Sequence, residues 1–231
     1  AKKLGFNNIS IDLIYSLPNQ STKKWRKNLE IAFSLNIQHI SSYSLTIEEN
    51  TQLFHLIKTK KLKELDEEIS SEHFNLLLKE SQKNGFIQYE ISNFGRKGYF
   101  SKHNSSYWLG KSYLGIGPSS HSYNGESRSW NISNNKKYIT LISENKLPSE
   151  IEVLTEYQKY NEYIFTSLRT MWGIDLKHVK RSFSKEFYLH LFSLSEKWIK
   201  SVDIIKSENT LKLTEKGKLL ADTISSDLFR V

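Results

Sequence analysis

One aromatic segment near the middle of the chain holds the residues best suited to chemistry. His103 is followed directly by Asn104, and two serines separate this pair from Tyr107 and Trp108. A neutral imidazole nitrogen can ligate a metal ion, and aromatic rings can pack on a flat macrocycle. The alternative is a histidine hydrogen-bonded into a loop beside two packing aromatics, and the composition of the segment alone favours it.

Two further polar residues are candidates. His121 follows the run Gly-Ile-Gly-Pro-Ser-Ser and has the same two interpretations as His103. Asp12 lies in the middle of a predicted strand, on its polar face, where an unpaired charge would be costly. We therefore expect a cationic or hydrogen-donating partner for Asp12, either a ligand amine or a group on a neighbouring strand. The other histidines lack ligand-like spacing and are predicted to be structural or exposed: His39, His55, His73, His178 and His190.

The composition excludes several kinds of chemistry. The chain has 231 residues and no cysteine, so it is not a disulfide scaffold, a Cys-ligated zinc module, a thiol enzyme or a self-contained iron–sulfur protein. No serine–histidine–aspartate arrangement or paired general acid and base is visible, so no catalytic residue is predicted. No apolar run approaches the ~20 residues that a membrane span needs, and hydrophobic residues, at 38%, suffice for a core.

The formal charge of +8 raises the question of nucleic-acid binding. Of the 33 basic residues, however, 27 are lysine and 6 arginine. The lysines of 58–63 are followed at once by Glu64 and three more acidic residues, a pattern typical of a solvated mixed-charge face. We therefore expect no nucleic-acid partner, whereas an anionic small ligand would profit from the same positive field.

The first half of the chain predicts alternating strands and helices. Residues 8–15 alternate as a strand, Ser21 or Thr22 can cap a helix, and a second strand covers 39–47. This order predicts a βα unit of a parallel sheet. Parallel strands are normally apolar on both faces, so the polar faces, such as Ser42, Ser44 and Thr46, are expected to line a ligand-filled lumen. The alternative is an edge strand facing water.

The second half changes character. A helix over 69–84 and a strand over 88–93 precede a loop-rich, aromatic stretch at 94–135. From about residue 150, helical stripes and a small hairpin follow in an order typical of a winged helix, and Thr214 can cap a last helix. The fold class is therefore α/β with a small second domain.

Five stretches resemble, in order, the radical SAM proteins related to oxygen-independent coproporphyrinogen III oxidase, and in particular their haem-chaperone branch, HemW. These stretches are 11–18, 39–51, 88–94, 103–108 and 115–122. Residues 168–173 and 213–217 resemble the C-terminal domain of the same family.

The resemblance implies the fold. Residues 1–135 would form the C-terminal portion of a partial (β/α)6 radical SAM barrel, and residues 150–231 the accessory winged-helix-like domain. In the full-length parent the barrel would hold a [4Fe–4S] cluster and S-adenosylmethionine. The cluster-binding Cys-x-x-x-Cys-x-x-Cys is not in this chain and is expected upstream of Ala1.

The resemblance also assigns residues. Asp12 matches a position that contacts S-adenosylmethionine. His103, Asn104, Tyr107 and Trp108 match the haem-binding signature of the branch, with His103 as the iron ligand. This assignment makes the ligating interpretation of His103 the favoured one.

One departure from the family stands beside these matches. The family's Gly-Leu-Pro-Gly is here Ser-Leu-Pro-Asn, with Ser16 and Asn19 in place of the two glycines. A serine at the first position predicts a less unusual backbone than a glycine would have.

The expected function is that of a haem chaperone, which binds haem and passes it to acceptor proteins in the cytoplasm. Without cluster ligands the chain is expected to be inactive in radical chemistry by itself. The alternative parent is a coproporphyrinogen III oxidase, which decarboxylates porphyrinogen propionates. An open barrel exposes strand edges, so a homo-oligomer is also expected to be possible.

Overall fold

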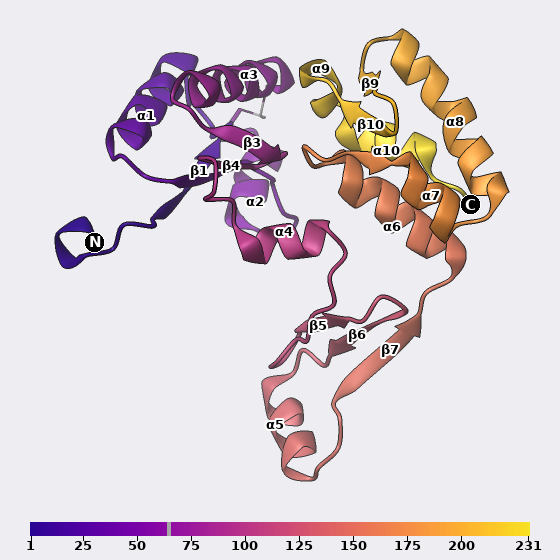
Figure 1. The fold of residues 1–231 in the computed structure, drawn as a ribbon. Coiled ribbons are helices and arrows are strands. Elements are labelled where there is room, and N and C mark those ends of the chain that lie inside the picture. The colour runs from indigo at the N-terminus through magenta and orange to yellow at the C-terminus, as the bar shows by residue number, and fades with distance from the viewer. Residues whose placement is uncertain (64–65) are drawn as a thin grey trace. The chain divides into compact units, whose positions relative to one another are not determined.

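The computed structural model describes residues 1–63 and 66–231, and the chain forms two compact units, residues 1–101 and 102–231 (Figure 1). Glu64 of the mixed-charge segment lies outside the described residues. The expected division into a barrel part, 1–135, and an accessory domain, 150–231, stays a prediction. Within the described ranges, no helix is both long and apolar enough to cross a membrane.

The first unit alternates strands and helices before ending in a hairpin. Its elements are a 3-10 turn (Lys2–Leu4), β1 (Ser10–Tyr15), α1 (Thr22–Ser34), β2 (His39–Ser44), α2 (Gln52–Lys58), α3 (Glu67–Lys83), β3 (Ile87–Glu90) and β4 (Asn93–Gly95). The predicted βα unit is confirmed, because β1 and β2 pair in parallel and α1 connects them. Ser21 caps α1, its hydroxyl accepting a hydrogen bond from the Lys24 amide at 3.3 Å.

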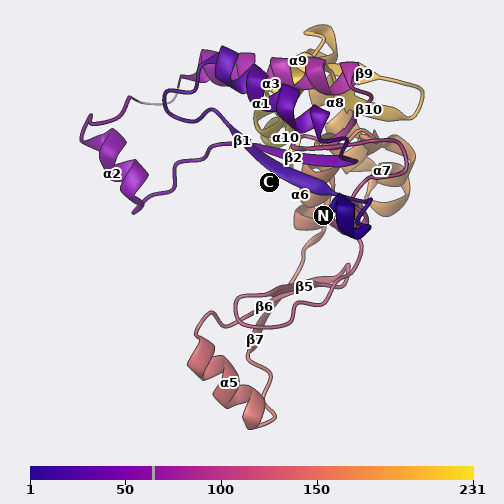
Figure 2. The ribbon, with the colours of Figure 1, turned by 90° about the vertical axis from the view of Figure 1, so that its left-hand side faces the viewer.

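The sheet is mixed rather than wholly parallel. Its order is β1-β2-β4-β3, and β4 runs antiparallel to both of its neighbours. The segment predicted as a single strand over 88–93 therefore contains most of β3, the turn at 91–92 and the first residue of β4. Helices α1 and α3 lie together over one face of this sheet (Figures 1 and 2). Trp25, Leu29, Ile40, Leu77 and Phe94 form the buried centre between them.

The serines of β2 correct one expectation. The parallel register places Ile40 opposite Ile11 and Ser42 opposite Leu13, so Ser42 shares the face of the buried Ile40. On that face Ser44 Oγ lies 3.3 Å from Ser70 Oγ of α3. The lumen face predicted for Ser42 and Ser44 is therefore wrong, because this face is the one toward α3: Ser42 is buried on it, and the exposed Ser44 lies beside Ser70.

The opposite face of the sheet is also polar. It carries Asp12 beside Ser41 in register, and His39 next along β2. His39 is buried, with Nδ1 2.7 Å from Ser10 Oγ and Nε2 2.8 Å from the Tyr89 hydroxyl. Burial lowers the pKa of His39, and the charge of Asp12 opposes that shift only in part.

The second unit contains a three-stranded sheet and a helical domain. Its elements are α4 (Lys102–Trp108), β5 (His121–Tyr123), β6 (Ser127–Asn131), α5 (Asn135–Ser143), β7 (Ser149–Val153), α6 (Glu156–Leu168), β8 (Ile174–Asp175), α7 (Leu176–Ser182), α8 (Lys185–Lys200), β9 (Ile204–Lys206), β10 (Thr210–Leu213), α9 (Glu215–Lys218) and α10 (Ala221–Leu228). The stretch 94–135, predicted as loop-rich, thus holds α4 and the β5–β6 hairpin.

The helical domain has the predicted winged-helix order. Helix α6 is followed by β8, α7, α8 and the β9–β10 hairpin, and the strands lie in the order β8-β10-β9. Tyr160, Ile164, Leu191 and Ile224 are completely buried at its centre. Thr214 caps a helix as predicted, but that helix ends after one turn, and α10 forms separately.

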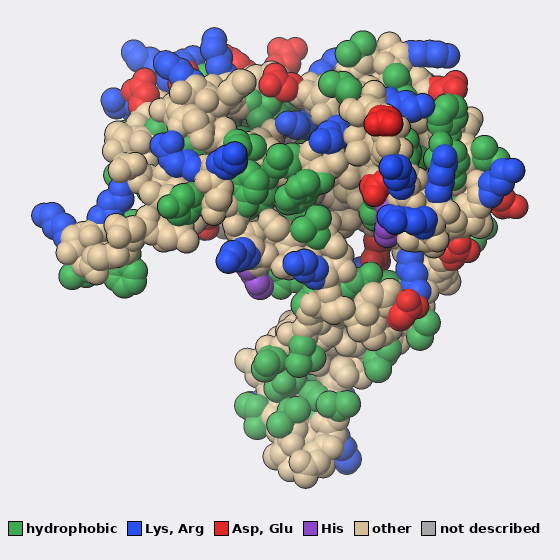
Figure 3. Space-filling view, viewed as in Figure 1, with side chains coloured by type: hydrophobic (Ala, Val, Ile, Leu, Met, Phe, Trp, Pro, Cys, Tyr) green, Lys and Arg blue, Asp and Glu red, His purple; other side chains and the backbone are tan. Residues whose placement is uncertain are grey.

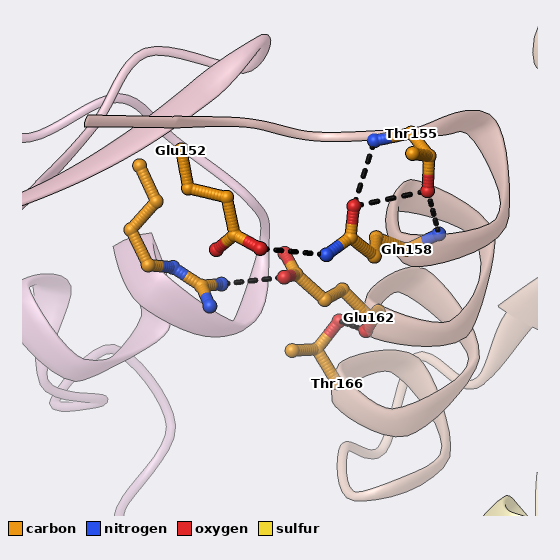
Figure 4. Close-up of polar contacts among 6 residues, drawn as sticks. Glu152, Thr155, Gln158, Glu162 and Thr166 are labelled. Carbon is orange, nitrogen blue, oxygen red and sulfur yellow. Dashed lines mark hydrogen bonds and ion pairs between the residues drawn. The ribbon is translucent and has the colours of Figure 1, made fainter.

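Polar contacts fix the β5–β6–β7 sheet to the start of α6 (Figure 4). Thr155 and Gln158 form a capping box at the first turn of α6. The Gln158 amide donates to Glu152 of β7 at 2.7 Å, and Arg128 of β6 pairs with Glu162 of α6 at 2.6 Å. One face of this sheet is therefore turned toward α6.

Candidate functional site

The predicted haem signature folds as helix α4. His103 and Tyr107 are one turn apart, as are Asn104 and Trp108, so the four residues lie on two adjacent stripes of the helix. His103 and Tyr107 are exposed, whereas Asn104 and Trp108 are half-buried. The His103 and Tyr107 rings meet edge to face, with centroids 4.9 Å and planes 86° apart.

The His103 imidazole is available to a ligand. Within the described part of the chain, neither of its ring nitrogens makes a hydrogen bond to protein. By contrast, His39 is bonded at both nitrogens, and His190 Nε2 lies 2.9 Å from the Phe229 carbonyl oxygen. The interpretation of His103 as a histidine hydrogen-bonded into a loop is therefore wrong: the residue is helical and its ring is exposed.

The other stripe of α4 is anchored to the winged-helix domain. The Arg169 guanidinium carbon lies 5.9 Å from the centre of the Trp108 ring and 5.0 Å from that of Phe165. Arg169 also forms an ion pair with Asp222 of α10. Trp108 therefore makes a cation–π contact with the residue that ends α6.

Two tyrosines that the sequence did not single out extend the site. The Tyr107 ring packs on Tyr113 with centroids 4.7 Å apart, and Tyr113 packs on Tyr123 at 6.1 Å. Tyr113 and Tyr123 also exchange two backbone hydrogen bonds, of 2.8 and 3.0 Å. Aromatic enrichment of 94–135 was the available signal, but it could not say which rings would meet.

A pocket of about 490 Å³ lies on the β5–β6–β7 sheet, and His103 is not one of the residues that line it. Its lining residues are Ser112, Tyr113, Leu114, Ser122, Tyr123, Asn124, Ser127 and Ser129. Ser122 pairs directly with Ser129 across the strands, whereas the face turned toward α6 carries Arg128 and Glu152. The serines therefore lie on the face away from α6.

His121 is exposed and is not placed against His103 by any contact in the described residues. Its ring lies 6.4 Å from that of Trp130, on the neighbouring strand. The glycine stretch before it has a packing role, because a Cβ on Gly115 would lie 2.2 Å from the His121 carbonyl oxygen. Close packing of backbone on backbone thus accounts for Gly115, whereas Gly117 has open space around it and a positive φ of 102°.

Asp12 belongs to the first unit and is exposed on β1. The expectation of a partner rested on burial of this carboxylate, and that premise is wrong in this chain because water solvates the group. In the turn that follows β1, Ser16 has φ of 59° and Asn19 of 61°, both in the left-handed region that favours glycine. The predicted ordinary backbone at Ser16 is therefore also wrong.

The comparisons with known proteins agree with the resemblance. No family profile matches the chain. The heme chaperone HemW of Bacillus subtilis is 35% identical over 230 residues, which cover 97% of this chain and 59% of that protein. HemW of Lactococcus lactis is 29% identical over 223 residues, with 96% and 59% covered. The mitochondrial radical S-adenosyl methionine domain-containing protein 1 of Danio rerio is 39% identical over 121 residues, 52% of this chain and 27% of that protein.

A solved structure shares the fold. Coproporphyrinogen III oxidase (HemN) from Escherichia coli, a radical SAM enzyme, superposes with a TM-score of 0.75 at 19% identity, covering 99% of this chain and 56% of that one. The chain spans 59% of the length of the HemW proteins of Bacillus subtilis and Lactococcus lactis. Over that part of their length, the chain is similar to the HemW branch of the radical SAM proteins.

Proposed function

We propose that this chain binds haem, with His103 as a ligand of the iron, and serves in a haem chaperone that passes haem to acceptor proteins. The observation that carries the proposal is the exposed imidazole of His103, whose ring nitrogens are not engaged by the described protein residues. The Tyr107 ring packs edge to face against the His103 ring, with the two centroids 4.9 Å apart. A neutral imidazole with an open approach is the donor that haem iron accepts in many proteins.

The surroundings of His103 fit a flat, largely apolar cargo. The exposed Tyr107 ring lies one turn along α4 from His103, and the Tyr113 ring packs on it. The half-buried Trp108 adds aromatic surface on the next stripe of the helix. Such rings contribute apolar contact area and have well-defined orientations. Asn104 adds an amide at the same level of the helix.

The other cofactors belong to the full-length parent in this proposal. The chain has no cysteine, so its own residues offer no thiolate to a [4Fe–4S] cluster. Asp12, as an exposed carboxylate on β1, fits a contact to the amino group of S-adenosylmethionine bound by the parent. A cytoplasmic location and self-association stay predictions.

Coproporphyrinogen III oxidase activity of the parent is the second candidate. The fold shared with the Escherichia coli enzyme, at a TM-score of 0.75, favours it. The complete His-Asn-x-x-Tyr-Trp signature supports the chaperone instead. A decarboxylation assay on the full-length protein with a reconstituted cluster separates them, because only an oxidase converts coproporphyrinogen III.

Haem titration of the 231-residue chain tests the role of His103. We expect His103→Ala to change the Soret spectrum of the bound haem and to weaken binding about tenfold or more. His55→Ala is the matched control, since His55 is also exposed on a helix but lies on α2. An unchanged Soret spectrum and affinity in His103→Ala would overturn the proposal.

A further inference from the structure

The winged-helix domain carries a second feature, which nothing in the proposed haem site uses. Four side chains form one continuous row across α7, α8 and β9: Lys180, Tyr188, Phe192 and Lys206. The Lys180 ammonium lies 4.4 Å from the centre of the Tyr188 ring, and the Lys206 ammonium lies 4.4 Å from that of Phe192. The two rings stack on each other, with centroids 6.3 Å apart.

This row is exposed to solvent at its apolar centre. Phe192 is 37% exposed, and Leu189, which neighbours Tyr188 along α8, is 54% exposed. Isolated exposed apolar residues are common, but a contiguous apolar group bordered by charges is typical of an interaction site. Figure 3 shows Lys and Arg side chains beside hydrophobic ones over α7 and α8.

The cations around the row are not neutralised within the protein. Among the described residues, neither Lys180 nor Lys206 forms an ion pair with a carboxylate, and the same holds for Lys177 and Arg181 of α7. Basic residues elsewhere on this domain do have such partners, as Lys197 has in Asp227 at 2.8 Å. The unpaired charges at both ends of the row therefore remain free to pair with acidic groups of another molecule.

The outward side of α8 distinguishes between two kinds of acidic partner. In winged helices that read DNA, the helix in this position contacts base edges and phosphates, which requires polar and basic side chains. Here the middle of α8 presents Leu189, Phe192 and Glu196 to solvent, and its exposed lysines, Lys185, Lys197 and Lys200, lie in its first and last turns. The leucine and phenylalanine suit the apolar side chains of a protein partner, which a phosphate backbone does not have.

We propose that this row, with Leu189, is a docking surface for an acidic amphipathic segment of a partner protein. Apolar side chains of the segment would cover Leu189 and Phe192, and its carboxylates would pair with Lys180 and Lys206 at the two ends. Charge of the opposite sign at the rim speeds association and selects partners, whereas the apolar centre holds the complex. The surface is independent of the haem proposal and stands if that proposal fails.

Binding of a synthetic amphipathic peptide, with glutamates on one side and leucines on the other, tests the surface. Affinity is measured by fluorescence anisotropy with the 231-residue chain. We expect Lys180→Glu combined with Lys206→Glu to weaken binding about tenfold or more, and the affinity of the unmodified chain to fall as salt is raised. The matched control is Lys136→Glu combined with Lys137→Glu, two exposed lysines of α5.

A second pair of variants tests the apolar centre. Leu189→Ser should weaken peptide binding about tenfold, whereas Leu147→Ser, at a residue that is 86% exposed, should leave it unchanged. Circular dichroism confirms that each variant is folded. Equal losses in the row variants and the controls would overturn the proposal. So would tight binding of a DNA or RNA duplex, but not the peptide, through the same lysines.

Discussion

The imidazole of His103 stands edge-on to the ring of Tyr107, with centroids 4.9 Å apart and planes crossing at 86°. The two residues are four positions apart in α4, so the helix itself sets the contact. Tyr107 is in turn held by Tyr113, at 4.7 Å. The orientation of His103, the proposed iron ligand, therefore depends on the Tyr107 ring. That ring packs on Tyr113, which pairs with Tyr123 of β5.

Removal of the Tyr107 ring should weaken haem binding without removing the ligand. We expect Tyr107→Ala to cost about 0.5–1.5 kcal/mol of binding free energy, the usual energy of an aromatic pair. Tyr107→Phe keeps the edge-on ring and should bind as the unmodified chain does. Haem titration followed in the Soret band measures both. A loss as large in Tyr107→Phe as in Tyr107→Ala would assign the effect to the hydroxyl and contradict the packing argument.

The sequence predicted the elements that carry a clear apolar pattern and missed several short ones that do not. The β1–α1–β2 unit, α6, α8 and the β9–β10 hairpin each carry a clear apolar pattern, and all are present. Helix α4 and strands β4 to β6 are 3 to 7 residues long. Over so few residues, serines, asparagines and aromatics produce no readable period.

The turn after β1 shows a different limit of the sequence. The serine at position 16 predicted a less unusual backbone than a glycine would have, yet its φ angle is 59°. The surroundings account for this: the Ser16 hydroxyl donates to Ser70 Oγ at 2.8 Å, and its amide donates to His73 Nδ1 at 3.4 Å. Tertiary contacts from α3 therefore fix a conformation that the residue type disfavours.

Asn19 should tolerate glycine but not alanine. Its φ of 61° lies in the left-handed region, where asparagine is tolerated and a Cβ-bearing residue without a local hydrogen bond costs about 1–2 kcal/mol. We expect Asn19→Ala to lower the free energy of unfolding by about that amount, and Asn19→Gly to leave it nearly unchanged. Urea denaturation measures both. Asn8→Ala, at an exposed residue outside the left-handed region, is the control, and a loss there as large as at Asn19 would refute the argument.

Gly217 should not accept any side chain. A Cβ at this position would lie 2.0 Å from the Asp203 carbonyl oxygen, so α9 or the chain before β9 would have to move. We expect Gly217→Ala to destabilise the second unit by about 1–3 kcal/mol, the usual cost of overpacking. At Gly125 a Cβ would meet nothing within 4 Å, and only its φ of 94° opposes substitution. Thermal unfolding should therefore show a larger loss for Gly217→Ala than for Gly125→Ala, and the reverse order would contradict the packing reason.

Arg169 should be replaceable by neither lysine nor alanine. Its guanidinium lies over two rings, 5.0 Å from Phe165 and 5.9 Å from Trp108, and a lysine keeps the charge but not the flat contact. We expect Arg169→Lys to cost about 1 kcal/mol of stability and to change the fluorescence of Trp108. The Asp222 side chain is 76% exposed, so Asp222→Asn should cost at most about 0.5 kcal/mol. A costlier Asp222→Asn would mean that the ion pair, rather than the rings, holds Arg169.

His73 should make the first unit less stable in mild acid. The side chain is fully buried, and its Nε2 has no hydrogen-bond partner among the described residues. Burial lowers the pKa of His73 from its ordinary 6.5, although the charge of Glu72 opposes this shift. Below about pH 6.5 the unfolded chain therefore binds a proton that the folded chain refuses, so stability falls as pH falls, by at most about 1.4 kcal/mol per pH unit for this proton.

A variant that cannot titrate isolates this contribution. His73→Phe loses the bond from the Ser16 amide, so it should be less stable at neutral pH, but its stability should depend less steeply on pH. The pKa of His39 is also lowered by burial, and its contribution is the same in both proteins. Urea denaturation at about pH 7.5, 6 and 5 gives the two slopes. If the slopes are equal, His73 binds its proton equally well in the folded and unfolded chains, and burial does not exclude the charged form.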